Sequence, residues 1–153
     1  MPRSDALIDL LGALAYGQLS AFDQLAHDAR LAPTLDGRAE MSATAATELG
    51  DYRRLAARLK ELGCSPADAM APFVSALDTY HSLTQPSTWL ESVVKAYVGE
   101  GLAADFYREV AAFVDEPTRE LIYEVIVDAD RARFASREVR SAIGAATDGT
   151  AVV

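Results

Sequence analysis

The sequence predicts an all-α protein built as a four-helix bundle with one long crossover. Apolar residues recur every three or four positions along almost the whole chain, strand-like alternation is absent from the pattern, and Gly and Pro gather at a few joints. With 153 residues, half of them apolar, the chain can bury one sizeable core. We therefore expect a single domain over residues 1–145 and a flexible tail over 146–153, where the periodicity stops.

Two long helices joined near Pro33 form the first predicted hairpin. The first covers about residues 4–31 and the second about 36–62. Gly63 is expected as the C′ residue of the second helix, because glycine enters the left-handed conformation without steric cost. The stripes that should face the core are Leu7, Leu11, Leu14, Gln18, Ala21 and Leu25, then Met41, Ala45, Glu48, Tyr52, Leu55, Leu59 and Leu62.

Two capping-box sequences mark the crossover and the third long helix. Ser65-Pro66-Ala67-Asp68 puts a hydroxyl at the N-cap, a proline at N1 and an acid at N3, and it starts a short helix ending near Leu83. Thr88-Trp89-Leu90-Glu91 then opens the third long helix. The crossover thus holds one extra helix, as in bundles with a single long connection.

A tight joint at Asp115-Glu116-Pro117 separates the third long helix, about residues 88–114, from the fourth, about 117–143. Asp115 is expected as the cap and Pro117 in the first turn of the fourth helix. Short joints predict antiparallel hairpins. The stripes are Leu90, Val93, Tyr97, Glu100, Ala104, Tyr107, Ala111 and Val114, then Leu121, Val125, Asp128, Ala132, Ala135 and Val139.

Each of the four stripes contains one polar residue near its middle. Counting from the joints at about 1.5 Å per residue brings these residues level within each hairpin. A lone polar residue on a stripe usually lies at the core boundary and reaches water, but four at one depth predict a shared buried layer. Asp51 and Arg131 follow three residues after two of its acids, on the same face. The layer residues are Gln18, Glu48, Glu100 and Asp128.

The segments AYGQLSAF, ELGDY, KAYVGEGLAADFYREV and VDADRARF carry a family resemblance over about residues 5–143. The chain resembles the ferritin-like superfamily, and within it the branch similar to tRNA 2-methylthio-N6-isopentenyladenosine hydroxylase. That resemblance implies a ferritin-like bundle with a di-iron centre, held by glutamates and Glu-x-x-His pairs, that uses O₂. It implies iron or manganese as cofactor, with ligands among Glu48, Asp51, Glu100 and Asp128.

Three of the six ligand positions depart from the family's pattern. Gln18 stands where the family has a glutamate, and Asp51 and Arg131 stand where it has histidines. An amide binds iron weakly, and arginine offers no lone pair because it stays protonated. We therefore expect no cofactor and no bound metal, and a buried network in which Arg131 bonds the surrounding carboxylates.

Other polar side chains are assigned around this layer. Tyr16, Tyr52 and Tyr97 are expected as hydrogen-bond donors to the carboxylates. His27 and His81, the two histidines of the chain, lack the spacing of the layer, so surface or packing positions are expected for both.

Three functions from different classes follow from this pattern. The favoured one is a non-enzymatic ferritin-like protein with a structural or interaction role, no pocket of ligand size and a homodimeric state. The second is a metal-dependent, tRNA-hydroxylase-like oxidoreductase. The third is a metal-free enzyme in which Glu48, Glu100 or Asp128 acts as general acid or base on a small apolar substrate in the bundle core.

Four glycines flank the layer and bear on this choice. They either leave room for a small molecule between the helices or allow close helix packing, and the packing role is favoured. These glycines are Gly17, Gly50, Gly99 and Gly101.

The charge and the apolar distribution limit partners and location. A net charge of -9 and a pI of about 4.6 disfavour nucleic acid as a partner. No run of 18 apolar residues occurs, so no membrane span is expected. The first residues lack the pattern of a secretory signal, and the single Cys64 suits a reducing compartment, so a cytoplasmic location is expected.

Overall fold

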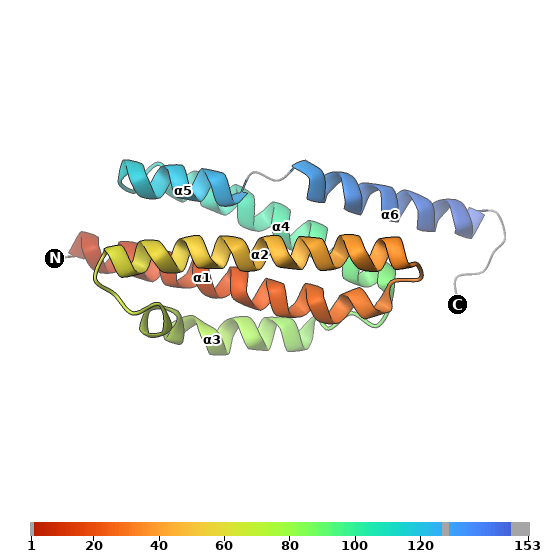
Figure 1. Cartoon of the computed structure of the whole chain (residues 1–153), viewed down its shortest axis with the longest axis horizontal. Helices are drawn as coiled ribbons and strands as arrows, with labels where there is room; N and C mark the ends of the chain where they lie inside the picture. Colours follow the sequence, from red (N-terminus) through yellow and green to blue (C-terminus); the bar gives the residue numbers. More distant parts are fainter. Residues whose placement is uncertain (1, 127–128, 148–153) are drawn as a thin grey trace.

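The computed structural model describes residues 2–126 and 129–147, with side chains at 5–126 and 133–145. No strand occurs within this part of the chain, so the all-α prediction is confirmed. None of its helices has the length and apolar character needed to cross a membrane. The elements, drawn in Figure 1, are α1 (Pro2–Asp28), η1 (Ala29–Leu31), α2 (Leu35–Glu61), α3 (Pro66–Leu83), α4 (Trp89–Ala111), α5 (Glu116–Ile126) and α6 (Ala129–Thr147).

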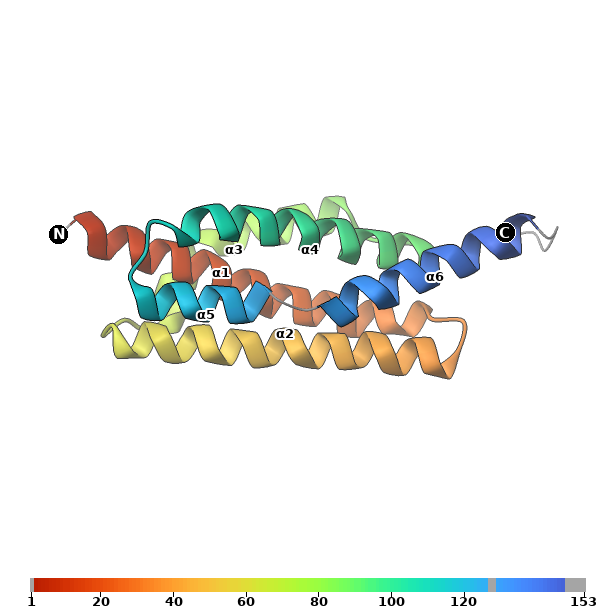
Figure 2. The ribbon, with the colours of Figure 1, turned by 90° about the horizontal axis from the view of Figure 1, so that it is seen from above.

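Two helical hairpins lie side by side along the long axis of the molecule. One consists of α1 and α2, and in the other α4 runs against α5 and then α6 (Figures 1 and 2). The crossover helix α3 packs along α1, so the predicted crossover layout is confirmed. α1 makes extensive contact with α2 and α3 but only sparse contact with α4. The two hairpins therefore meet less closely than the helices within each of them.

The predicted helix caps are confirmed. Thr88 Oγ1 accepts from the Glu91 N–H at 3.2 Å, and Glu91 Oε2 accepts from the Thr88 N–H at 3.3 Å, which completes the capping box. Ser65 Oγ accepts from the Asp68 N–H at 3.4 Å. Gly63 ends the second helix with a φ of 78°, a conformation in which a side chain is strained.

The fourth predicted helix is described only in part, and one predicted boundary needs correction. The fourth predicted helix corresponds to α5 and α6, which lie on either side of residues 127–128, outside the described part of the chain. α6 extends to Thr147, so the predicted start of the tail at residue 146 falls inside that helix.

A tightly packed cluster fills the end of the bundle that holds the α4–α5 turn. Leu11, Leu55 and Ile122 are at most 1% exposed there. Gly12 permits the close approach of α1 to α3, because an added Cβ would lie 2.1 Å from the carbonyl oxygen of Ala69. We call the following residues the packed cluster: Leu11, Leu14, Ala15, Leu55, Leu59, Ala69, Met70, Ala111, Ile122 and Val125.

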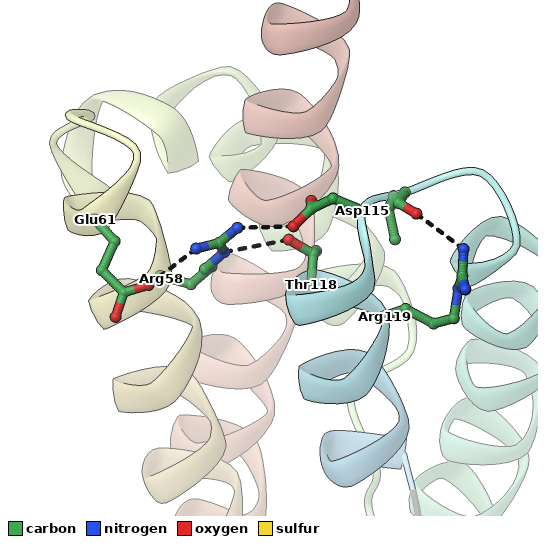
Figure 3. Close-up of polar contacts among 6 residues, drawn as sticks. Arg58, Glu61, Asp115, Thr118 and Arg119 are labelled. Atoms are coloured by element: carbon green, nitrogen blue, oxygen red, sulfur yellow. Dashed lines mark hydrogen bonds and ion pairs between the residues drawn. The ribbon is translucent and has the colours of Figure 1, made fainter.

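Arg58 ties the end of α2 to the α4–α5 turn (Figure 3). Its guanidinium donates to Asp115 Oδ2 at 2.8 Å and to Thr118 Oγ1 at 3.2 Å. Desolvation favours a higher pKa for Asp115, but hydrogen bonds from Thr118 and the charge of Arg58 lower its pKa overall. Arg119 donates to two backbone carbonyls nearby. Polar contacts thus close this end of the bundle.

Candidate functional site

A cavity of about 460 Å³ lies in the bundle core, between the two hairpins and α3. Its walls come mainly from α1 and α4, with contributions from α2, α3 and α5. The volume falls in the range of small-molecule sites. Short side chains open this space, because they do not reach across to the opposite helix. They are Gly17, Ala21, Ala96, Gly99, Ala103 and Ala104.

Three residues of the predicted polar layer line this one cavity. Gln18 comes from α1, Glu48 from α2 and Glu100 from α4. Glu48 is only 5% exposed, and the Gln18 Oε1 atom is buried without a hydrogen-bond partner among the described residues. Glu48 and Glu100 do have interaction partners. The structure therefore brings polar residues from three stripes to one space, and their functional roles stay predictions.

The other three predicted positions lie differently. Asp51 is buried but is not among the residues that line the cavity. Arg54 Nη1 lies 3.8 Å from Asp51 Oδ1, and Arg54 also pairs with Glu124 of α5. A positive charge for Asp51 thus comes from its own helix. Asp128 and the side chain of Arg131 lie outside the described residues.

The tyrosine beside the layer is Tyr107, which was not predicted as a donor. Burial, followed by the charge of Glu48, raises the pKa of Tyr107 to about 12, so its phenol is protonated at neutral pH. The prediction is wrong for Tyr97, which is 52% exposed. It is also wrong for Tyr16, which donates to Asp78 Oδ1 of α3 at 2.5 Å.

The glycines beside the layer do not mediate close helix packing, so that preference is wrong. Gly50 and Gly101 are exposed, and no described atom lies within 4 Å of a Cβ added at either. Gly17 and Gly99 line the cavity, where an added Cβ would meet its nearest neighbours at 3.6 and 3.8 Å. Two of the four glycines thus contribute to the cavity.

A second set of polar residues lines the same cavity, and the sequence analysis did not predict these residues. Asp28 ends α1, His81 lies near the end of α3 and Lys95 lies on α4. We call these three residues the Asp28 cluster. Asp28 Oδ1, His81 Nδ1 and Lys95 Nζ are all buried without a hydrogen-bond partner among the described residues. His27 is exposed, as expected, and His81 is half-buried with its ring against Tyr80, a packing position that also borders the cavity.

Burial dominates the electrostatics of the Asp28 cluster. It raises the pKa of Asp28 and lowers the pKa of Lys95, and the attraction between the two charges offsets both shifts only in part. Burial also lowers the pKa of His81, so the imidazole is neutral at pH 7. Lys95 Nζ lies 5.5 Å from the ring centroid of Tyr80, where the aromatic face attracts the cation.

A family model described as a ferritin-like domain of actinomycetes matches residues 3–151. The chain belongs to this ferritin-like family. No curated protein matches the chain. In ferritin-like bundles the side chains that bind metal project from facing helices into the core. The cavity of this ferritin-like domain lies in the same kind of place, between facing helices of the two hairpins.

The donor set that the described residues provide differs from that of a di-iron centre. Within the described part of the chain, no three His, Cys, Asp or Glu side chains come close enough together to hold a metal ion. Gln18, which lines the cavity, offers only a neutral amide. The histidine that does line the cavity, His81, comes from the crossover helix α3.

A sequence signal existed for Asp28 and was missed. The first stripe ends at Leu25, and its next position three residues later is Asp28, at the end of the helix. The sequence does not predict Lys95 as a cavity residue, because the predicted core-facing stripe of the third helix includes Tyr97. The buried face of α4 instead includes Val93 and Ala96.

Proposed function

We propose that this ferritin-like domain binds a small, mostly apolar organic molecule in its core cavity and works without a di-iron centre. The cavity of about 460 Å³ carries this proposal. It reaches Glu48 and Glu100, yet most of its wall is made of apolar and small side chains. Apolar walls with a few placed polar groups are typical of ligand sites.

The cavity also changes the choice among the predicted functions. The favoured interpretation, a structural or interaction module, came with the expectation of no pocket of ligand size, and the cavity of about 460 Å³ argues against that expectation. A tRNA substrate is disfavoured because a net charge of -9 repels a phosphate backbone. Binding of an uncharged molecule inside the bundle agrees with the presence of the cavity and with the negative net charge.

The loss of di-iron binding is part of the proposal. Two of the altered ligand positions, Gln18 and Arg131, provide no anionic donor, and Asp51 lies beside Arg54 at 3.8 Å. We include the carboxylate–arginine network here: Arg131 replaces the metal as counter-charge for Glu48 and the other carboxylates.

Metal analysis tests this part. Protein expressed in iron-rich medium should contain well under one iron per chain, and a stoichiometric pair of irons contradicts the proposal. The matched positive control is the triple variant Gln18→Glu/Asp51→His/Arg131→His, which restores the family's donors and should gain iron.

Cavity binding is tested with methylnaphthalene as an apolar probe, followed by its fluorescence. The wild-type protein should bind the probe, and Ala103→Phe should weaken binding by about tenfold or more, because the new ring occupies the cavity. Ala46→Phe, at an exposed position of α2, is the matched control and should bind normally. Equal binding by both variants contradicts the cavity as the site.

A second candidate function is metal-free acid–base catalysis on the bound molecule. The observation in its favour is that Glu48 and Glu100, from different helices, line the same cavity. Glu48→Gln keeps the shape of the side chain and removes its proton transfer. This function requires that a bound compound be converted by the wild type and not by Glu48→Gln, with binding unchanged in the variant.

The homodimer stays a prediction, and α4 offers a surface for it. Several large apolar side chains lie exposed along this helix, and an exposed apolar patch often marks an association surface. The exposed side chains include Val94, Val98, Leu102 and Phe106. Light scattering should give twice the chain mass for the wild type and the chain mass for Phe106→Glu, a position that does not line the cavity.

A further inference from the structure

The residues of the Asp28 cluster line the cavity, and each holds a buried polar atom that has no hydrogen-bond partner among the described residues. Lys95 Nζ is a donor, and Asp28 Oδ1 is an acceptor while the carboxyl is ionised. Both atoms are buried, and Asp28 is only 3% exposed. Burying polar groups without partners is costly, so this end of the cavity favours a ligand that supplies their hydrogen bonds.

The hydrogen bonds around His81 indicate which of its two ring nitrogens donates a hydrogen bond and which accepts one. Ser20 Oγ donates its proton to the carbonyl oxygen of Gly17 at 3.1 Å. The tautomer that keeps this bond donates an N–H from His81 Nε2 to Ser20 Oγ across their 3.3 Å contact. In the neutral ring the other nitrogen, Nδ1, keeps its lone pair and accepts.

The charges that line the cavity argue against an anionic ligand. Among the described lining residues the negative charge of Asp28 opposes the positive charge of Lys95, and Glu48 and Glu100 have interaction partners of their own. Asp28 and Lys95 attract each other without a hydrogen bond between Asp28 Oδ1 and Lys95 Nζ. A carboxylate placed near Lys95 would therefore also be repelled by Asp28.

We infer that the Asp28 cluster recognises the hydroxyl group of an otherwise apolar, uncharged molecule. The hydroxyl oxygen accepts a hydrogen bond from Lys95, and its proton is donated to His81 Nδ1 or to Asp28 Oδ1. A hydroxyl satisfies donor and acceptor atoms at once and brings no charge. The apolar body lies along Ala21, Ala96 and Ala103. This inference rests on the proposed function, because it names the ligand class of the same cavity.

Three probes of the same ring system test it at neutral pH: naphthalenemethanol, methylnaphthalene and naphthoate, titrated against the full chain. The alcohol should bind about ten- to a hundredfold more tightly than the methyl compound, because hydrogen bonds to charged groups are gained. Naphthoate should bind more weakly than the alcohol by about tenfold or more. Equal affinities for the three probes overturn the inference and leave cavity binding intact.

Two variants separate recognition from general loss of structure. Lys95→Met should reduce the alcohol's advantage over the methyl compound by about tenfold, because the donor is gone. The matched control is Lys60→Met, at an exposed position of α2, which should keep the full advantage. Asp28→Asn removes the repelling charge and should raise the affinity for naphthoate by about tenfold.

The gain in Asp28→Asn is the decisive result, because a misfolded variant cannot produce it. An unchanged naphthoate affinity in Asp28→Asn, or an alcohol preference that survives in Lys95→Met, overturns the inference. If none of the probes binds the wild type, the result contradicts binding in the cavity. It then overturns both the proposed function and this inference. A preference for the methyl compound overturns only the role of the Asp28 cluster.

Discussion

The packed cluster and the cavity are two regions of one core, built from the same helices, and they differ in side-chain size and in polarity. Around the α4–α5 turn, Leu11, Leu55 and Ile122 fill the space between helices, with at most 1% of each side chain exposed. Further along α1 and α4, Ala and Gly occupy the facing positions, and buried polar atoms appear between them. The first region holds the hairpins together, and the second leaves room for another molecule.

The close packing and the cavity therefore lie at different positions along the bundle axis. Close packing, the Arg58 contacts and the cap at Asp115 all lie at one end. The Asp28 cluster lies on the cavity side, where burial opposes the charged forms of Asp28 and Lys95. A core with one well-packed end can tolerate such unfavourable groups.

The largest effect is expected from truncation in the packed cluster. Leu55→Ala should reduce the free energy of unfolding by about 2–5 kcal/mol, because Leu55 is fully buried and its removal leaves a void. Leu77→Ala, in the cavity wall, should cost less than about 2 kcal/mol, since Leu77 faces space on one side. Urea denaturation measures both. Equal losses would mean that the two regions are packed alike.

Enlarging a side chain gives the opposite test. Ala15→Leu, within the packed cluster, should cost about 1–3 kcal/mol, because Ala15 is fully buried and the added atoms have no space. Ala103→Leu, in the cavity wall, should change the free energy of unfolding by less than about 1 kcal/mol. A penalty at Ala103 as large as that at Ala15 argues against the cavity in solution.

Asp28 and Lys95 should be energetically coupled. A double-mutant cycle with Asp28→Asn and Lys95→Met is expected to give an interaction energy of about 0.5–3 kcal/mol in the free energy of unfolding, because each charge partly offsets the burial of the other. The exposed pair Asp105 and Arg108, 2.8 Å apart, serves as the control and should give below about 0.5 kcal/mol. Additive effects at Asp28 and Lys95 exclude the coupling.

The smallest effects concern pH, and they should have opposite signs at the two ends. The folded-state pKa of Asp115 is lowered, so its stabilisation is present above the ordinary pKa of 3.8 and is lost as the pH falls below that value. The folded-state pKa of Asp28 is raised, so its ionised form destabilises at neutral pH, and this cost disappears as the pH falls toward 3.8.

Unfolding of the Asn variants between pH 7 and 3 measures this contrast. The stability advantage of the wild type over Asp115→Asn should shrink on acidification below pH 3.8. The free energy of unfolding of the wild type, relative to that of Asp28→Asn, should instead rise as the pH falls toward 3.8. The same direction of change for both variants would contradict the assigned environment of one of the two carboxyls.

Periodicity, caps and joints predicted most of the fold, because each depends on residues close together in the sequence. The stripes of the first hairpin are buried or half-buried as expected from Leu11 to Leu59, and the caps at Ser65 and Thr88 form. The helix ends were less predictable: the last turns of the third predicted helix form the loop before Asp115.

The site was only partly predictable. Gln18, Glu48 and Glu100 were found because they interrupt apolar stripes at one depth, and they line one cavity. The contact of α3 with α1 brings His81 to the same cavity, and no local pattern encodes that packing. Whether small residues leave a space depends on how closely the hairpins approach, which is a property of the whole fold.

We propose that the core of this ferritin-like domain holds an organic molecule and not a pair of irons. A crystal structure of protein grown with both iron(II) and naphthalenemethanol tests it most directly. The account predicts electron density for the alcohol in the cavity, with its oxygen beside Lys95 and Asp28, and no anomalous iron signal between Glu48 and Glu100. Two iron peaks beside Glu48 and Glu100, with no alcohol bound, would contradict it.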